Sequence, residues 1–283
     1  MLLFKQNTDV NSTESNQNLN TGKEVIYMDA KMLDGKIAII TGASYGMGTS
    51  MAELFSQEGA KLVLVARGKE KLDAEVEKIR AMGGQAIGVV ADTCSKEDTK
   101  RVFEECLKEY GDLDILINNA GIGEQVMVDE CTEEWMLHVL DTNLVGPFRY
   151  ISEALKIFMP KNEGVIINTS SVNGTRPFCG VSYTSSKGGL NTLTKNVAMR
   201  LIDTNIRINA IAPGSTITPA HLTNKAGGQE GGAKMLQYSG HFVYFPGPEC
   251  DPMDQAYACL YLASKMGRAV RGQVIQVCNG AFL

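Results

Sequence analysis

Two side chains four positions apart, those of Tyr183 and Lys187, could together move a proton. They lie in the stretch Ser182–Leu190, which leads into an apolar-periodic run that predicts a helix. Residues i and i+4 share one face of a helix, so the phenol and the ammonium would meet there. A free phenol titrates at about pH 10, and a nearby ammonium lowers that pKa. The pair therefore predicts a general acid or base, although the same spacing also suits an ordinary exposed helix contact.

The composition narrows the class of protein and its partners. The chain has 283 residues, of which 44% are hydrophobic and 21% are charged, which is an ordinary globular balance. A net charge of −5 gives no indication of nucleic acid or an anionic membrane surface as a partner. No apolar run reaches the ~18 residues of a membrane span, and the N-terminus lacks the apolar core of a signal peptide. We therefore expect a cytoplasmic protein.

The cysteines and histidines give no indication of a metal site. Seven cysteines are scattered without a C-x-x-C pair, and there are only three histidines. An odd number of cysteines without a secretion signal predicts reduced thiols, most of them in the core.

Residues 1–32 form a polar extension, rich in Asn, Thr, Ser and Gln over most of its length. Such a composition is typical of a solvated tail. The alternative hypothesis is that the extension packs on a neighbouring subunit.

A glycine-rich turn stands between a predicted strand and a predicted helix. Lys36–Thr41 is a β-branched run without polar alternation, as expected of a buried parallel strand. Gly42-Ala-Ser-Tyr-Gly-Met-Gly48 follows at once, and Thr49–Gly59 carries apolar residues at helical spacing. Glycines let the backbone approach a pyrophosphate, and a helix N-terminus offers free N–H groups. The arrangement therefore predicts a dinucleotide-binding loop rather than a purely structural turn.

The residue after the second strand indicates which dinucleotide binds. Lys61–Ala66 is predicted as that strand, and its end holds Arg67 and no acidic residue. An acidic residue here bonds the ribose 2′-hydroxyl of NAD, whereas a basic residue accommodates the 2′-phosphate of NADP. Arg67 therefore favours NADP(H), while an Arg67 that only stacks on the adenine would also suit NAD(H).

Strands and helices alternate along the chain. Further strands are predicted at residues 85–90, 113–117, 165–169, 207–212 and 273–278, and helices at 69–82, 95–110 and 253–264. The alternation predicts an α/β fold with a parallel, doubly wound sheet, helices on both faces and ligands at the carboxyl ends of the strands. Asp92 stands at one such end, where it either bonds an adenine amino group or caps the next helix.

Several motifs then follow one another in a characteristic order. They are Thr41–Gly48, Asn118–Gly121, Asn143, Ser170-Ser171, Tyr183 with Lys187, Pro213-Gly214 and Gly272–Val277. In this order they resemble the short-chain dehydrogenases/reductases over residues 33–280. The resemblance implies a single Rossmann-type domain at residues 33–283, a homotetramer, and hydride transfer between a nicotinamide and a carbonyl or alcohol.

The resemblance also implies roles for the matching residues. Tyr183 is the acid or base, Lys187 lowers its pKa and bonds the nicotinamide ribose, and Asn143 holds a water of the proton relay. Asn143 is expected in a long helix, where it also suits an ordinary polar residue satisfied locally. The residues expected to bind the cofactor are Gly42, Ser44, Tyr45, Gly46, Met47, Gly48, Arg67, Asp92, Thr93, Asn119, Ala120, Gly121, Tyr183, Lys187, Pro213, Gly214, Ile217 and Thr218.

Two adjacent serines compete for the remaining catalytic position. Ser171 stands three residues before Gly174, the usual frame in this family, whereas Ser170 has the usual spacing of 13 residues to Tyr183. We choose Ser171, on the interpretation that the intervening loop is one residue shorter. Its hydroxyl is expected to bond the substrate oxygen.

Residues 219–250 are expected to cover the substrate. They hold Met235, Leu236, Tyr238, Phe242, Tyr244 and Phe245. Such a cover suits a bulky apolar substrate, and Phe178 could line the same pocket. The alternative is a helix that packs on the core or on a partner subunit.

These features are similar to those of bacterial hydroxysteroid dehydrogenases, with the 20β type as the narrowest expectation. A second hypothesis is a 3-oxoacyl-carrier-protein reductase, whose acidic partner predicts a basic patch. Residues 219–250 offer only Lys225 and Lys234 against Glu230 and Glu249, which disfavours it. A third is a non-catalytic cofactor-binding sensor or scaffold, although such proteins usually lose the tyrosine or the lysine that this chain keeps.

Overall fold

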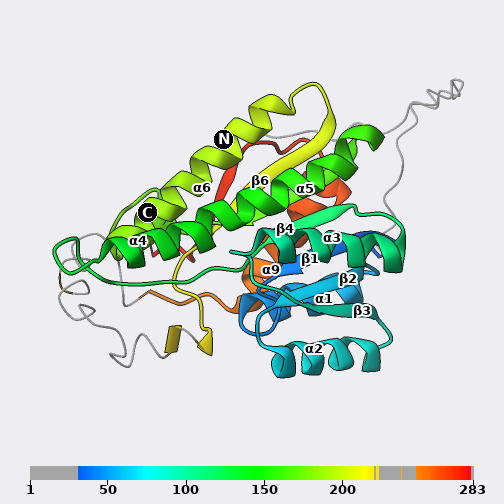
Figure 1. Cartoon of the computed structure of the whole chain (residues 1–283), viewed down its shortest axis with the longest axis horizontal. Helices are drawn as coiled ribbons and strands as arrows, with labels where there is room; N and C mark the ends of the chain where they lie inside the picture. The colour runs from blue at the N-terminus through cyan, green and yellow to red at the C-terminus, as the bar shows by residue number, and fades with distance from the viewer. Residues whose placement is uncertain (1–30, 220, 223–236, 238–246, 282–283) are drawn as a thin grey trace, which may run out of the picture. The chain divides into compact units, whose positions relative to one another are not determined.

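A computed structural model describes residues 31–219, 221–222, 237 and 247–281 (Figure 1). Its centre is a seven-stranded parallel sheet in the order β3-β2-β1-β4-β5-β6-β7. The strands are β1 (Ile37–Thr41), β2 (Lys61–Ala66), β3 (Gln85–Val90), β4 (Ile115–Asn118), β5 (Glu163–Thr169), β6 (Asn205–Pro213) and β7 (Val274–Val277). The predicted doubly wound α/β fold is confirmed.

Helices cover both faces of this sheet (Figure 1). They are α1 (Met47–Gln57), α2 (Lys69–Ala81), α3 (Lys96–Tyr110), α4 (Glu133–Leu140), α5 (Gly146–Lys161), α6 (Val181–Arg200) and α9 (Pro252–Ala263). One apolar core joins the sheet to α1, α2 and α9, and a second joins the opposite face to α3, α5 and α6. The sheet is therefore buried on both sides, as the unbroken apolar strands predict.

Strand β1 shows how the sequence builds both cores. Its residues are all buried, with Ala38 and Ile40 in the core of one face and Ile37 and Ile39 in the core of the other. Burying one such isoleucine side chain contributes about 1.5–3 kcal/mol. Pairing with β2 and β4 on either side then places this strand at the middle of the sheet.

The strand order reverses at β1 and β4, which are neighbours in the sheet although β2 and β3 lie between them in sequence. At such a switch point the connections leave in opposite directions and open a crevice at the carboxyl ends of the strands. The glycine turn after β1 and the Asn118–Gly121 stretch after β4 both lie at this edge.

One expected helix is interrupted. The long helix predicted around Asn143 consists of α4, a π-helical turn at Asp141–Val145, and α5. A π turn holds one residue more than an α turn and occurs frequently at functional sites. It therefore changes the direction in which the residues on either side of Asn143 project.

The described residues show neither a membrane-spanning helix nor a cluster of metal ligands. None of their helices is both long and apolar enough to cross a membrane. Within them, no three side chains of His, Cys, Asp or Glu come together as a metal site would require. The proposed extension at residues 1–32 lies outside these ranges apart from Lys31 and Met32.

Candidate active site

Helix α6 carries the tyrosine and the lysine. Tyr183 lies in its first turn and is partly buried, whereas Lys187 is buried one turn later. The Lys187 Nζ atom lies 5.7 Å from the centroid of the Tyr183 ring, so the two side chains share one face of the helix. Lys187 Nζ donates a hydrogen bond of 2.8 Å to the carbonyl oxygen of Thr169, the last residue of β5.

The face of α6 that packs on the sheet is unusually polar. Its buried residues are Ser182, Ser186, Lys187, Leu190, Asn191, Thr194 and Ala198. Thr194 accepts a hydrogen bond from Asn168 of β5, and Asn168 accepts one from Asn118 of β4, each 2.9 Å long. This chain of bonds fixes α6 against the carboxyl halves of β4 and β5, because an unpaired buried polar group is costly.

Asn143 is fully buried in the π turn and joins α6 to the segment after β4. Its Oδ1 atom accepts from Ile122 N at 2.9 Å, and its Nδ2 atom donates to Ile122 O at 2.8 Å and to Ser186 Oγ at 3.1 Å. A Cβ atom added to Gly121 would lie 3.1 Å from Asn143 Oδ1 and 3.4 Å from Lys187 Nζ. Gly121, Asn143 and Lys187 therefore converge on one point.

The two candidate serines have different partners. Ser170 Oγ donates to the backbone carbonyl of Lys187 at 3.3 Å, so it holds β5 against α6. Ser171 Oγ accepts from the backbone and side-chain nitrogens of Asn173, at 3.1 and 3.3 Å, and is hydrogen-bonded to the Tyr183 side chain. The structure thus brings Ser171, and not Ser170, to the tyrosine.

Burial controls the electrostatics of the pair. It raises the pKa of Tyr183 to about 12, although the hydrogen bond with Ser171 acts in the opposite direction. Burial also lowers the pKa of Lys187 to about 8. The pKa of the phenol is thus raised, whereas the ammonium alone was expected to lower it, because desolvation of the phenolate dominates. At neutral pH Tyr183 therefore keeps its proton.

The glycine turn forms a cradle in which side chains would not fit. Gly42 and Gly46 have positive φ angles of 66° and 63°, and a Cβ atom on Gly48 would lie 2.1 Å from Gly42 O. Asn119 Nδ2 donates to Thr41 O at 3.1 Å and to Gly42 O at 3.2 Å, bracing the turn from the end of β4. Bare backbone before the N-terminus of α1 fits a pyrophosphate.

Two buried side-chain oxygens without hydrogen bonds test further whether a dinucleotide fits this edge of the sheet. Asn119 Oδ1 and Thr169 Oγ1 are buried at the carboxyl ends of β4 and β5 and have no hydrogen-bond partner in the described chain. Together with the glycine cradle, these atoms make the edge compatible with a bound dinucleotide.

The residues expected around the adenosine half lie at the ends of β2 and β3. Arg67 is exposed directly after β2, and Tyr45 is exposed beneath Lys71, whose Nζ lies 5.9 Å from the ring centroid. Asp92 Oδ1 accepts from Cys94 N at 2.9 Å, and Thr93 is buried. The N-cap of α3 is Ser95, whose Oγ accepts from Asp98 N, so Asp92 does not cap that helix.

The segment after β6 reaches the glycine cradle. Thr218 lies beside Gly46, since a Cβ atom there would be 3.4 Å from Thr218 Cγ2. Gly214 is anchored through its N–H to Val277 O at 2.9 Å, and Ile217 is exposed. His221 Nε2 lies 2.6 Å from Glu249 Oε1, which also accepts from Ser215 Oγ at 2.8 Å. These contacts join the two ends of residues 219–250, which are expected to cover the substrate.

Little of the proposed substrate cover lies in the described ranges. The aromatic and apolar residues expected there, Met235, Leu236, Tyr238, Phe242, Tyr244 and Phe245, fall outside them. Phe178 is partly buried and packs on the pair formed by Val172 and Cys278. Cys278, to which the sequence assigned no role, therefore contacts the residue that follows Ser171.

Glu124 lies at the site but belongs to none of the sequence motifs. Glu124 is buried, and its carboxylate bonds the first turn of α6. Its position three residues after Gly121 was the available signal, but the pattern gave no reason to expect burial.

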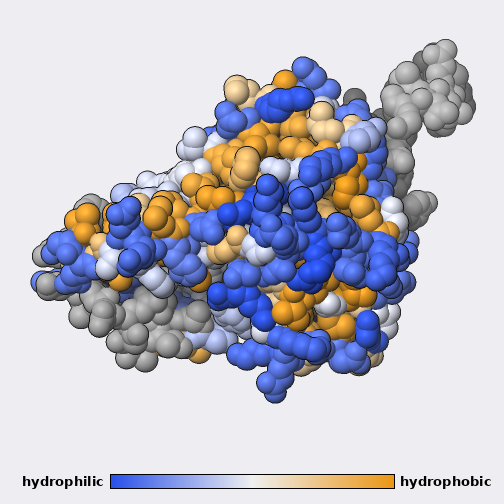
Figure 2. Space-filling view, in the orientation of Figure 1, coloured by the Kyte–Doolittle hydropathy of each residue, from blue (hydrophilic) through white to orange (hydrophobic). Residues whose placement is uncertain are grey.

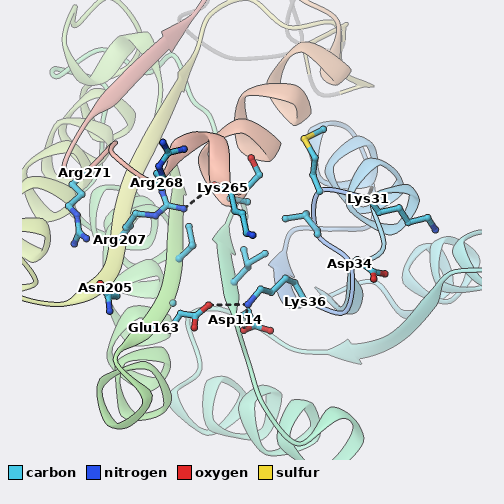
Figure 3. A pocket seen from close by; sticks show the side chains of 17 residues that line it. Lys31, Asp34, Lys36, Asp114, Glu163, Asn205, Arg207, Lys265, Arg268 and Arg271 are labelled. Atoms are coloured by element: carbon cyan, nitrogen blue, oxygen red, sulfur yellow. Dashed lines mark hydrogen bonds and ion pairs between the residues drawn. The ribbon is translucent and has the colours of Figure 1, made fainter. Parts of the chain in front are cut away.

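A separate cavity lies at the opposite edge of the sheet. It measures about 540 Å³ and is lined at the amino ends of β1, β4, β5 and β6 and by the α9–β7 connection (Figure 3). Arg207 donates to Gly267 O at 2.8 Å, and Arg271 donates to Thr204 O and Ile206 O. These arginines hold the α9–β7 connection and β6 in place. No residue predicted for the site lines this cavity.

Comparisons with known proteins agree with this geometry. The family model described as short chain dehydrogenase matches residues 36–227. The chain is 37% identical to a 3beta-hydroxysteroid dehydrogenase of Eggerthella lenta, over 89% of this chain and 95% of that one.

Two solved structures are also similar. L-sorbose reductase from Gluconobacter frateurii, complexed with NADPH and L-sorbose, matches with a TM-score of 0.80 and 27% identity, over 89% of this chain and 98% of that one. A 3-ketoacyl-(acyl-carrier-protein) reductase from Brucella melitensis, complexed with NADH, matches with a TM-score of 0.78 and 29% identity, over 89% and 100%.

The fold and the site define a nicotinamide-dependent oxidoreductase of the Rossmann type. The chain belongs to the short-chain dehydrogenase family. It is an enzyme that acts on CH–OH groups with NAD(P), which sets aside the hypothesis of a non-catalytic sensor or scaffold.

Proposed function

We propose that this enzyme interconverts a carbonyl and a secondary alcohol on a bulky apolar substrate, with Tyr183 as the acid and base. The observation that supports this most is the convergence of Tyr183, Ser171 and Lys187, with Lys187 beside Gly121. The preceding residue, Ala120, lies against Gly42 of the glycine cradle. When bound, a reduced nicotinamide supplies the hydride. The residues of the chain hold the carbonyl oxygen and supply its proton.

In reduction, the substrate oxygen accepts hydrogen bonds from Ser171 Oγ and from the Tyr183 hydroxyl. Because the pKa of Tyr183 is raised to about 12, the phenol is protonated at neutral pH, which is the form that reduction requires. Tyr183 donates its proton as negative charge develops on that oxygen. Lys187 and Asn143, both buried beside Gly121, line the route by which the tyrosine regains a proton.

Lys187 has a second role in this proposal. Its ammonium would bond the nicotinamide ribose of a bound cofactor, and it stabilises the phenolate that Tyr183 becomes. With a pKa of about 8, the amine is mostly charged at neutral pH and is close to releasing its proton. A group in this state suits a proton relay better than a fully solvated lysine.

For the substrate we favour a steroid or a similar polycyclic ketone. The 37% identity to a 3beta-hydroxysteroid dehydrogenase supports this class, and the apolar composition of residues 219–250 suits it. The 20β position stays the narrowest form of the proposal. We propose Phe178, which lies in the loop between Ser171 and Tyr183, as part of the wall of the substrate pocket.

A 3-oxoacyl thioester is the second candidate substrate. The structural similarity to a 3-ketoacyl-(acyl-carrier-protein) reductase favours it. The balance of two lysines against two glutamates in residues 219–250 offers little attraction for an acidic carrier protein.

For the cofactor we favour NADP(H), because Arg67 is exposed at the end of β2 and has no ion-pair partner in the described chain. The guanidinium is thus available to a 2′-phosphate. Replacing Arg67 by Ala should raise KM for NADPH by about 10-fold and change KM for NADH much less. Equal changes in both KM values would contradict this role.

We further propose a cytoplasmic homotetramer. Exposed apolar side chains lie on the π turn, on α5 and at the end of α6, and Figure 2 shows such side chains over this part of the surface. They are Val145, Phe148, Met159, Met199 and Ile202. Burying such a surface between copies would remove it from water. Sedimentation equilibrium should give four times the 30.6 kDa chain mass, and a monomer would contradict the proposal.

One paired assay tests the proposed reaction. Oxidation of NADH and of NADPH is followed by absorbance, with a 20-ketosteroid, a 3-ketosteroid and a short 3-oxoacyl thioester as substrates. Turnover with a ketosteroid alone supports the steroid proposal, and the position reduced identifies its type. Turnover with the thioester alone would replace it with the second candidate. Failure of all three would contradict both.

A further inference from the structure

Glu124 places a buried carboxylate against the first turn of α6. It lies in the segment after β4, and only 4% of its surface is exposed. Its Oε1 atom accepts from Ser182 Oγ at 2.7 Å and from Tyr183 N at 2.8 Å. Its Oε2 atom accepts a hydrogen bond of 2.5 Å from Val126 N. Both carboxylate oxygens are therefore used, and one of them bonds the backbone of the proposed acid itself.

This contact replaces a cap that α6 lacks. Its N-cap residue is Gly180, which has no side chain, and its first turn holds no acidic residue. By contrast, α3, α4 and α9 are capped by Ser95, Thr132 and Asp251 from the adjoining chain. A negative charge at a helix N-terminus is stabilised by the free N–H groups and by the helix dipole. Glu124 provides that charge from 56 residues upstream of Gly180.

The backbone at the start of α6 leaves room for the Glu124 carboxylate and pairs with the segment that carries it. A Cβ atom on Gly180 would lie only 1.9 Å from Glu124 Oε2, so a glycine there leaves room for it. Gly180 N donates to Glu124 O at 3.2 Å, and Val181 N donates to Val126 O at 3.1 Å. The segment 124–126 and the start of α6 thus form a short pairing, which is closed by the glutamate side chain.

The same segment also holds the other members of the site. Ile122, two residues earlier, is bonded on both its N–H and its carbonyl by Asn143. Gly121 lies against Lys187 and Asn143. One short stretch after β4 therefore makes contact with Tyr183, Lys187 and Asn143.

From these contacts we infer that Glu124 is a positioning residue, which fixes the Tyr183 hydroxyl relative to Ser171 and the bound substrate. The inference rests on the proposed function, since it requires Tyr183 to be the proton donor. A proton donor displaced by a fraction of an ångström loses alignment in the transition state, so the effect falls on kcat.

Glu124→Gln tests the inference with little change in shape. The amide keeps one oxygen, so its NH₂ group must face either Val126 N or the donors on Tyr183 and Ser182. We expect kcat to fall by about 10-fold, with KM and the dissociation constant of NADPH within about twofold of wild type. Gly180→Ala should act similarly, because the new methyl group displaces the Glu124 carboxylate while the φ angle of −56° at Gly180 suits alanine.

The decisive comparison uses the Tyr183→Phe background. If Glu124 acts through the tyrosine hydroxyl, Glu124→Gln should lower kcat no further in a protein that already lacks that hydroxyl. Ser95→Ala, which removes the cap of α3, is the matched control for loss of a helix cap and should leave kcat within about twofold of wild type.

Three results would overturn the inference. The first is a wild-type kcat in both Glu124→Gln and Gly180→Ala. The second is the same fractional loss in the presence and absence of the tyrosine hydroxyl, which would indicate a general structural role. The third is undiminished turnover by Tyr183→Phe, which would refute the proposed function as well and is measured separately.

If Glu124→Gln does not fold, Gly180→Ala alone supplies both comparisons.

Discussion

Each edge of the parallel sheet holds one lysine with polar partners, and the pKa values of the two lysines are shifted in opposite directions. At the amino edge, burial lowers the pKa of Lys36, but Glu163 at 3.0 Å and Asp114 at 3.2 Å outweigh it and raise that pKa. At the carboxyl edge, burial lowers the pKa of Lys187 to about 8. No carboxylate in the described chain lies within ion-pair distance of Lys187.

The amino edge is arranged for stability. Asp114 accepts from Lys36, Lys161 and the N–H of Ile37. Arg207 and Arg271, which line the same cavity (Figure 3), donate to backbone carbonyls. The carboxyl edge leaves an ammonium with one carbonyl partner beside a protonated phenol. A buried charge without a counter-charge costs free energy, and active sites are where such costs are found.

The largest expected effect is on turnover. Replacing Tyr183 by Phe removes only the hydroxyl and should lower kcat by ~10²–10⁴-fold, because the proton donor is lost. The dissociation constant of NADPH, measured by fluorescence titration, should change little. Retained turnover would show that the carboxyl edge is not arranged for this chemistry.

The second effect separates activity from stability at Lys187. Replacing it by Met should abolish most of the activity. It should also increase the free energy of unfolding at pH 7, by about 1–2 kcal/mol, because an uncompensated buried charge is removed. Urea denaturation of both proteins measures this difference. A variant that is inactive and also markedly less stable would instead indicate a structural role.

The pH dependence of stability should differ in sign between the two edges. The pKa of Lys187 is about 8 in the folded protein and near 10.5 when unfolded, so its cost is fully present below pH 8 and is relieved as the pH rises toward 10.5. Wild type should therefore gain about 2 kcal/mol relative to Lys187→Met between pH 7 and pH 10. Lys36 contributes the opposite slope, since its stabilisation is lost as pH rises through its raised pKa. A constant difference between wild type and Lys187→Met would contradict the lowered pKa.

At the amino edge we expect an effect on stability alone. Asp114→Asn removes the carboxylate between Lys36, Lys161 and Ile37 N, and should lower the free energy of unfolding by about 1–2 kcal/mol. Turnover per folded molecule should stay at the wild-type value, because no proposed site residue touches Asp114. Loss of kcat in the folded variant would break the division of roles between the two edges.

The sequence was sufficient for the strands and for the glycine turn. Unbroken β-branched runs such as Ile37–Thr41 have few alternatives, and a glycine turn between such a strand and a helix has a recognisable pattern. The Tyr183 and Lys187 spacing also placed both side chains on one face of α6, as expected.

Three features needed the folded chain. The π turn holds Asn143, whose hydrogen-bond partners Ile122 and Ser186 are 21 and 43 residues away in sequence. The raised pKa of Tyr183 follows from burial, which no i,i+4 pattern contains. Glu124 stands in a stretch without a motif, and its partners lie 58 and 59 residues downstream. Long-range contacts of this kind leave no local periodicity.

The most direct test of this account is the pKa of Lys187 itself. Lysine labelled with ¹³C at Cε allows its titration to be followed by NMR in the cofactor-free protein, with Lys187→Met to assign the signal. We expect a midpoint near pH 8. A midpoint at or above the ordinary value of about 10.5 would show that the ammonium is solvated or paired, and would contradict the contrast between the two edges.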